Sequence, residues 1–320
     1  MLSYFIQRLL TGLVTLFVVS VIVFLLVRVL PGDAAIMLTG GDSTVSEKDL
    51  AQIRKNLGLD QPLVVQYADW ARKAIVLDFG NSLRTGNPVR TDIGRRFPYT
   101  AQIIVLAMLI AIVVGIPIGV MCARYVGSWT DRILQAVSIF GLAAPSFWIG
   151  LLIILGLVTL FQWSAPLFWE PFWVSPWQST SQLIWPAIAV GLRQTALIVR
   201  MTRSIMLEVL NEDYIRTARA KGLSEQRVVY RHGLRNALLP VVTLIGFEFG
   251  ALFGGLIITE TVFSVPGIGQ YVVSSILNRD YAAAQGVVLV LASIVVIGNL
   301  AVDLLYGVLD PRTRIRKAAA

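Results

Sequence analysis

The reactive side chains of this sequence are few and scattered. There is one histidine, His232, and one cysteine, Cys122, so no His/Cys cluster can hold a metal and no internal disulfide can form. A phosphate-binding loop needs a glycine framework followed by Gly-Lys-Ser/Thr, whereas Lys221 and Gly222 occur in the reverse order without that framework. No pair of carboxylates is placed for acid–base catalysis. The residues give little support to an enzyme, and an energy source is expected on another chain.

Two charged residues interrupt long apolar stretches. Arg193 lies in the run from about Leu183 to Val199, and Glu248 lies in the run from Asn236 to Thr259. A charge inside a bilayer costs at least about 2.5–3.5 kcal/mol on insertion scales, so each needs a partner or a wet cavity. Their opposite signs and similar depths suggest an ion pair between neighbouring helices. The alternative is that one or both line a cavity and select solutes by charge.

The segment from Glu212 to Arg235 has the signals of two short helices joined by a turn. Acidic residues open its first part and basic residues close it, as the helix dipole favours. Gly222 falls where the end of a helix prefers a left-handed residue. Ser224 can cap a second helix that runs to Arg235. Pro240 then falls near the first turn of the next apolar run, where its missing N–H costs least.

The elements that must position these residues are membrane helices. Of the 320 residues, 56% are hydrophobic and 14% are charged, and the mean hydropathy is +0.73. This composition excludes a single soluble domain, a disordered chain and a coiled coil. A span needs about 20 mostly apolar residues, and in lipid such runs are helices. Six stretches qualify: Leu9–Val27, Ala101–Ala123, Ile133–Trp169 (one span and an apolar outer loop), Leu183–Val199, Asn236–Thr259 and Tyr281–Val302.

The basic residues of the short loops predict the orientation. The segment from Arg200 to Arg235 contains eight basic residues, and more follow in the C-terminal tail, whereas the segment from Phe161 to Gln182 contains none. Basic residues stay on the cytoplasmic side, which predicts cytoplasmic termini. The net charge of +8 is then a topology signal, and nucleic acid is unnecessary. The first apolar run is too long for a secretory signal and lacks a small-residue cleavage site, so it is predicted to be an uncleaved span.

The loop from Pro31 to Thr100 is too long for a plain connector. Hydrophobic spacing predicts amphipathic helices over Ser46–Asn56 and Val64–Leu77. Two prolines inside spans, Pro117 and Pro145, are expected to kink their helices. The neighbours of Pro145, Phe147 and Trp148, are candidates for a gate, although aromatic residues facing lipid or another helix are commoner.

Several ordered motifs resemble one transporter family. The cytoplasmic segment Arg216-Thr217-Ala218-Arg219-Ala220-Lys221-Gly222, followed by Leu238-Leu239-Pro240, is similar to the "EAA" loop of ABC importer permeases. Further motifs resemble the dipeptide/oligopeptide/nickel branch, in its first-listed permease type: Leu30-Pro31-Gly32-Asp33, Leu57-Gly58-Leu59-Asp60-Gln61-Pro62, Ala144-Pro145-Ser146-Phe147-Trp148-Ile149-Gly150-Leu151, Glu260-Thr261-Val262-Phe263-Ser264-Val265-Pro266-Gly267-Ile268-Gly269, Asp303-Leu304-Leu305-Tyr306 and Leu309-Asp310-Pro311-Arg312. One departure is that Arg216 or Thr217 stands where the loop's glutamate is common.

The resemblance implies an all-α integral membrane protein with the six-span transmembrane domain of a type I ABC importer. Its parts would be the N-terminus and first span (1–30), an external loop (31–100) and a core permease domain (101–320) with a coupling loop (200–235). The implied partners are a second homologous permease subunit, two ATPase subunits, an extracytoplasmic substrate-binding protein and the lipid bilayer. The chain itself would bind no cofactor, and ATP and Mg would bind to the ATPase subunits. The expected location is the bacterial inner membrane.

The resemblance also assigns roles to residues. The short helix from Glu212 to Lys221 would dock on an ATPase, with Tyr214, Ala218 and Lys221 on the contact face and Arg216 and Arg219 solvated. The implied coupling residues are Glu212, Asp213, Tyr214, Ala218, Arg219, Lys221, Gly222 and Glu225. Candidates for the translocation pathway are Phe147, Trp148, Arg193 and Glu248, and candidates for binding-protein docking are Gln61, Pro62, Pro266 and Gly267.

The expected function is a permease subunit that forms half of a pathway for peptides or similar small solutes. Nickel complexes, glutathione and oligosaccharides are alternative cargoes within the family. The rival from another class is a secondary transporter or channel that acts without ATPases. Such a protein would be expected to show inverted repeats and paired proton-relay carboxylates, of which the sequence shows no convincing sign.

Overall fold

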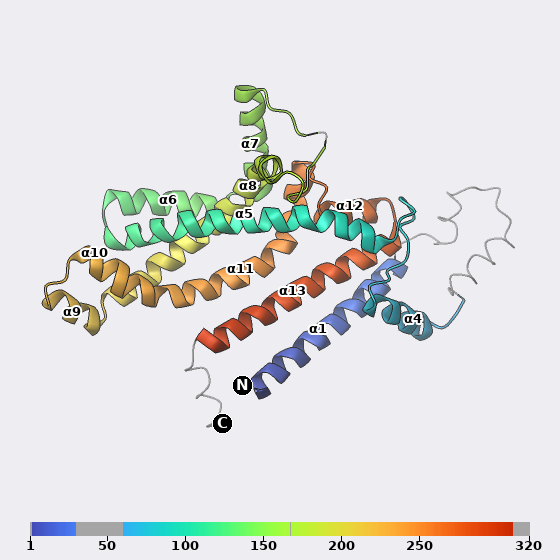
Figure 1. Cartoon of the computed structure of the whole chain (residues 1–320), viewed down its shortest axis with the longest axis horizontal. Helices are drawn as coiled ribbons and strands as arrows, with labels where there is room; N and C mark the ends of the chain where they lie inside the picture. Colours follow the sequence, from blue (N-terminus) through green and yellow to red (C-terminus); the bar gives the residue numbers. More distant parts are fainter. Residues whose placement is uncertain (1, 30–59, 167, 310–320) are drawn as a thin grey trace. The chain divides into compact units, whose positions relative to one another are not determined.

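The computed structural model describes residues 2–29, 60–166 and 168–309, and it is helical (Figure 1). The described residues form two compact units. Unit 1 contains residues 98–269 and the chain from Gly298 onward, and unit 2 contains residues 2–97 and 270–297. Two long helices, α5 (Val89–Arg124) and α13 (Tyr281–Leu309), each contribute to both units. The predicted helix over Ser46–Asn56 and the basic C-terminal tail lie outside the described residues.

Unit 1 is centred on α8 (Pro176–Leu210), which packs against α6 (Trp129–Ala143), α7 (Ser146–Phe161) and α11 (Arg235–Val262). Glycines let α5 approach α8 closely, as small residues do between membrane helices. A Cβ on Gly191 of α8 would lie 3.0 Å from the carbonyl oxygen of Ala107. A Cβ on Gly115 of α5 would lie 2.9 Å from Cγ2 of Ile198. These contacts pack the second and fourth predicted spans against each other.

The third apolar stretch is not one continuous helix. Helices α6 and α7 meet at an angle of 103°. The break falls at Ala144 and Pro145, both with extended backbone (φ −73°, ψ 126° and φ −63°, ψ 136°). The residue before a proline is driven out of the helical region, and proline itself has no N–H to continue the helix. The expected kink at Pro145 is therefore a complete change of direction, whereas Pro117 lies inside α5 as predicted.

The end of the segment from Glu212 to Arg235 also differs from the prediction. Helix α9 spans Asp213–Ala220, close to the predicted range, and is followed by α10 (Glu225–Arg227). A π-helical segment, η1 (Val228–Leu234), then joins α10 to α11 without a break. The predicted boundary at Arg235 is wrong, because the helix continues through it into the apolar run. Pro240 consequently lies inside α11 rather than at the start of a new helix.

Unit 2 contains α1 (Leu2–Val29), α4 (Leu63–Ile75), the start of α5, most of α12 (Ile268–Leu277) and the first part of α13. Helix α4 confirms the amphipathic helix predicted over Val64–Leu77. Its Tyr67 packs edge-on against Phe24 of α1, with ring centres 5.3 Å apart. The Tyr67 hydroxyl also lies 2.7 Å from the Ser20 hydroxyl.

Five of the described helices are long and apolar enough to span a membrane, and counting the bent α6–α7 pair as one span gives six. Five of the six predicted stretches fall on these helices, and the third, Ile133–Trp169, covers most of the bent pair and continues past its end at Phe161. The helix that carries the second stretch begins before the predicted start at Ala101. It is α5, which starts at Val89 and has Asp92 in its first turn. The orientation of the termini stays a prediction.

Candidate functional site

The strongest candidate site is the surface of α9. The acidic Asp213 lies in its first turn and Arg219 in its last, which matches the dipole at each end. Gly222 follows with φ +76°, in the left-handed region that glycine adopts without a steric penalty. The turn after α9 is therefore at Gly222, as predicted.

One side of α9 is buried in its own unit. Ile215 is fully buried and Ala218 is 7% exposed. They belong to an apolar cluster with residues of α5, α8, η1 and α11: Val120, Ala123, Met206, Leu210, Val228, Val229 and Ala237. Ala218 was expected on the face that contacts a partner, and this expectation is wrong, because the cluster already covers its side chain. The cluster fixes α9 on the ends of the longer helices.

The opposite side of α9 is exposed. Tyr214 keeps 41% of its surface accessible, and its hydroxyl accepts a hydrogen bond of 2.8 Å from Nδ2 of Asn236. Thr217, Ala220 and Lys221 are exposed as well. Arg216 is solvated as expected, with a contact of 3.3 Å to Asp213 on the same helix. The exposed side thus combines one aromatic residue, small residues and basic residues.

Arg219 does not simply extend into solvent. Its Nη2 lies 2.8 Å from Oε1 of Glu225, and its Nη1 donates to the carbonyl oxygen of Leu210 at 3.4 Å. The hydrogen bond to Glu225 raises the pKa of Arg219 above its ordinary value. The pair closes the turn at Gly222 by linking the last turn of α9 to the first residue of α10. It is exposed, so its contribution to stability is small.

The two charges inside apolar helices do not pair with each other. Glu248 of α11 is half-buried, and its Oε2 accepts a hydrogen bond of 2.9 Å from Nε2 of Gln194. Arg193 is exposed, and no ion pair joins it to Glu248, both residues being within the described part of α8 and α11. The expected ion pair is therefore wrong: α8 presents the neighbouring amide to Glu248. The cavity-lining alternative stays a prediction.

Phe147 and Trp148 lie in the first turn of α7, directly after the break. Both are exposed, at 40% and 41%, and the Trp148 ring packs edge-on against Phe140 of α6 at 6.2 Å between ring centres. This contact bridges the two arms of the bent pair. Both residues lie next to the break between α6 and α7, and a gating role for them stays a prediction.

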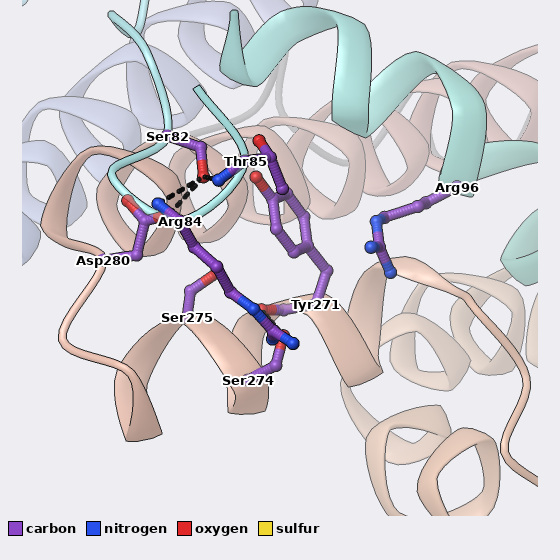
Figure 2. Close-up of a pocket in the computed structure, with 8 residues that line it drawn as sticks. All are labelled: Ser82, Arg84, Thr85, Arg96, Tyr271, Ser274, Ser275 and Asp280. Atoms are coloured by element: carbon purple, nitrogen blue, oxygen red, sulfur yellow. Dashed lines mark hydrogen bonds between the residues drawn. The ribbon is translucent and has the colours of Figure 1, made fainter. Parts of the chain in front are cut away.

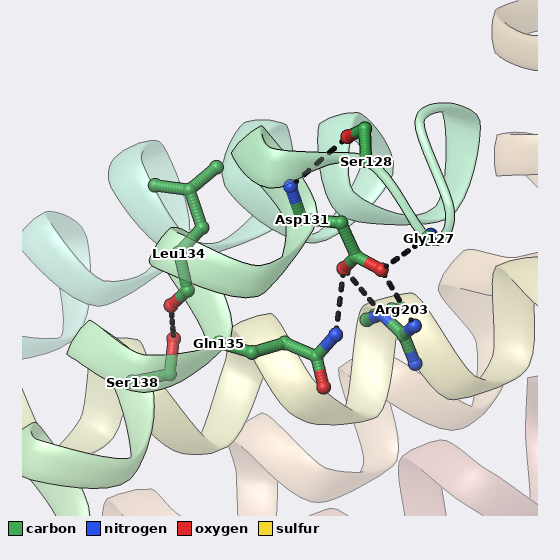
Figure 3. A network of polar contacts seen from close by, with 7 residues as sticks. All are labelled: Gly127, Ser128, Asp131, Leu134, Gln135, Ser138 and Arg203. Atoms are coloured by element: carbon green, nitrogen blue, oxygen red, sulfur yellow. Dashed lines mark hydrogen bonds and ion pairs between the residues drawn. The ribbon is translucent and has the colours of Figure 1, made fainter.

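Sequence reasoning missed a buried ion pair between α6 and α8 (Figure 3). Asp131 is 2% exposed and holds Arg203 through two contacts of 2.9 Å, from Nε to Oδ1 and from Nη2 to Oδ2. The carboxylate also accepts hydrogen bonds from the Gly127 N–H at 3.0 Å and from Gln135 at 2.8 Å. Ser128 caps α6 by accepting from the Asp131 N–H. The signal in the sequence was the Gly-Ser turn before an acidic residue, which places that residue in the first turn of a helix.

Two of the docking candidates, Pro266 and Gly267, directly precede α12, and the packing of the chain explains why a glycine is needed there. The buried carboxylate of Glu260 accepts a hydrogen bond from the Thr100 hydroxyl, and the Thr100 hydroxyl accepts one of 2.9 Å from the Ile268 N–H. Gly267 is buried directly against this carboxylate, and a Cβ there would overlap it. Of the two candidates, Pro266 is partly accessible and Gly267 is buried.

Gln61 and Pro62 lie in unit 2, at the start of α4. Gln61 is exposed, and Pro62 is the residue before the first turn of the helix. Their docking role stays a prediction. Across the described residues, no group of three or more His, Cys, Asp or Glu side chains is placed to hold a metal ion.

Comparisons with known proteins agree with this architecture. The sequence profile of the binding-protein-dependent transport system inner membrane component family matches residues 115–315, and the profile of its N-terminal region matches residues 1–104. The chain is 40% identical over 317 residues to a glutathione transport system permease protein of Escherichia coli, covering 99% of this chain and 100% of that protein. It is 39% identical over 314 residues to putative peptide transport system permease proteins of Brucella abortus and Brucella melitensis, covering 98% of this chain and 99% of each relative. The chain therefore belongs to the inner membrane components of binding-protein-dependent transport systems, the permease subunits of ABC importers.

Proposed function

We propose that this chain is one of two different permease subunits of an ATP-driven importer, and that it forms half of the pathway for peptides or similar small solutes. An external binding protein would deliver the solute, and two ATPase subunits would bind ATP and Mg. The relatives support this cargo class, since one is named for glutathione and others for peptides. Glutathione is itself a small peptide, so both names point to the same chemistry.

The observation that carries the proposal is the two-sided character of α9. Its buried side is fixed to α5, α8, η1 and α11 through one apolar cluster, and its other side is accessible. A partner that displaces α9 therefore acts on the ends of the longer helices of unit 1. A partner shifts a conformational equilibrium only through contacts that differ between the two states, and the exposed side of α9 offers such contacts.

The proposal is tested by site-directed cross-linking in the assembled transporter. Cys122 is the single cysteine of the chain and is fully buried, so an introduced cysteine becomes the reactive one without further engineering. Thr217→Cys and Ala220→Cys place a thiol on the exposed side of α9. Ser181→Cys, on the exposed start of α8 in the predicted outer region, is the matched control.

With a maleimide–benzophenone reagent, which attaches to the introduced thiol and photo-cross-links to a neighbouring chain without a second cysteine, we expect the two α9 variants to cross-link to an ATPase subunit. Ser181→Cys should give no cross-link to an ATPase subunit. The α9 cross-links are also expected to change in yield when ATP is added, because docking differs between states. Equal reactivity of all three variants, or a chain that purifies and transports without any ATPase, would favour a secondary transporter or channel instead.

A further inference from the structure

Unit 2 contains a cavity of about 170 Å³ that none of the predicted site residues line. Its walls come from the loop before α5, from α5 itself, from α12 and from the residue before α13 (Figure 2). The lining residues are Ser82, Arg84, Thr85, Arg96, Tyr271, Ser274, Ser275 and Asp280. Six of the eight carry hydroxyl or guanidinium donors, and the other two are a tyrosine and a carboxylate, so every lining residue offers a hydrogen-bonding group.

The two unpaired arginines of the cavity favour an anion. Within the described residues, neither Arg84 nor Arg96 forms an ion pair. The Arg96 guanidinium lies over the Tyr271 ring, 4.5 Å from its centre, which holds this cation at the wall of the cavity. Figure 2 shows Arg84 and Arg96 drawn on either side of Tyr271. Two guanidinium groups without carboxylate partners repel a cation and attract an acid.

The acidic and phenolic groups of the cavity already have hydrogen-bond partners within the fold. The Asp280 carboxylate accepts the Ser82 hydroxyl and, at 3.2 Å, the Ala283 N–H at the start of α13, so it is occupied within the fold. Tyr271 donates its hydroxyl to Asp92 at 3.2 Å. Burial, followed by the nearby Asp92 and Asp280, raises the pKa of Tyr271 to about 12, so the phenol stays neutral at physiological pH.

A buried hydroxyl in the same cavity lacks a partner. Ser275 is 3% exposed, and its Oγ forms no hydrogen bond in the structure. An unsatisfied buried polar group is costly, and such groups are rare in native proteins. A carboxylate accepts bonds from both guanidinium and hydroxyl donors, and guanidinium and carboxylate match in geometry. Its presence would satisfy Ser275 as well as the two arginines.

We infer that this cavity binds a carboxylate, held by Arg84 and Arg96 with Ser275 as an additional donor. The carboxylate belongs either to a free small solute or to an acidic side chain of the external binding protein. The inference concerns unit 2 alone and does not depend on the docking of α9. Its failure is therefore distinguishable from failure of the proposed function.

The test uses the purified transporter and sodium propionate as the probe. Propionate replaces chloride at constant ionic strength, and propionamide, the neutral analogue of the same shape, is the control. We expect propionate, but not propionamide, to raise the melting temperature saturably. Arg84→Gln and Arg96→Gln should each weaken the apparent affinity at least about tenfold, the effect of losing one charge-assisted hydrogen bond. Arg95→Gln removes an adjacent exposed arginine that does not line the cavity and should leave the affinity unchanged.

Equal responses of wild type, Arg84→Gln and Arg95→Gln, or equal effects of propionate and propionamide, would overturn the inference. Arg84 lies in an exposed loop, so its variant remains informative if Arg96→Gln fails to fold. The source of the carboxylate is identified by measuring association of the binding protein with the transporter. Competition by propionate alone assigns the carboxylate to the binding protein, and unchanged association assigns it to a free solute.

Discussion

Substitutions at Gly222 test how the end of α9 is held, because the effect of backbone strain can be separated there from the effect of steric clashes. Its φ of +76° lies in the left-handed region, and a Cβ at this position would meet no atom within 4 Å. A substitution here therefore suffers from backbone strain without a steric clash. The cost should follow the intrinsic preference of each residue for this region rather than its size.

We expect Gly222→Asn to cost little, because asparagine visits the left-handed region readily. Gly222→Ala should cost about 1 kcal/mol, the lower end of the penalty for a residue with a Cβ. Gly222→Val should cost about 2 kcal/mol, because β-branched residues are rarely found there. Asparagine is larger than alanine and similar in size to valine, so the series separates strain from bulk.

The assay is hydrogen exchange of the α9 amides in the purified transporter, which reports local opening. A cost of about 2 kcal/mol corresponds to about thirtyfold faster exchange through the open state in Gly222→Val, against less than about fivefold in Gly222→Asn. If α9 couples ATP hydrolysis to uptake, transport should fall in the same order. An order that follows side-chain volume, or equal protection of α9 in all three variants, would refute the reasoning.

Three further outcomes follow from contacts in unit 1, each measured as thermal stability of the purified protein. Asp131→Asn should destabilise by about 3–5 kcal/mol, because it leaves the Arg203 guanidinium without its buried partner; a change below 1 kcal/mol would contradict this. Gly119→Val should cost about 1–3 kcal/mol, because a Cβ there would lie 2.6 Å from a carbon of α8. The control Gly156→Val should be nearly neutral, because a Cβ there would meet nothing within 4 Å. Arg219→Gln should cost at most about 1 kcal/mol, since its pair is exposed, and the difference should shrink in high salt.

Local signals predicted most of the helices but not the contacts between them. The uncharged runs located the long apolar helices because a bilayer demands about 20 apolar residues. Gly222 located the end of α9 because few residues adopt its conformation. The break at Pro145 was expected only as a kink, since the angle depends on what packs against α7. The continuity of α10, η1 and α11 was missed because Ser224 and Pro240 are compatible both with two separate helices and with one continuous helix.

The helix that carries the candidate site was predicted in position, but the side of it that faces the rest of the chain was not. The range of α9 was correct, yet Ala218 proved buried, because helical spacing shows which residues share a face without showing which face the rest of the chain covers. Arg193 and Glu248 were chosen as opposite charges at similar depth, but the rotation of α8 presents Gln194 instead. The Asp131–Arg203 pair was overlooked because its two residues lie 72 positions apart in the chain.

The uninterrupted helix from Glu225 to Val262 has a mechanical consequence. Its 38 residues make a rod of about 57 Å, nearly twice the roughly 30 Å of a bilayer's hydrocarbon core. The π-helical η1 and Pro240 lie near its α9 end, and both are positions where a helix can bend. A tilt of about 10° around the midpoint would shift each tip by about 5 Å, close to the pitch of one helical turn. We expect a displacement of the α9 end to reach the other end of this helix, reduced by any bend at η1 or Pro240.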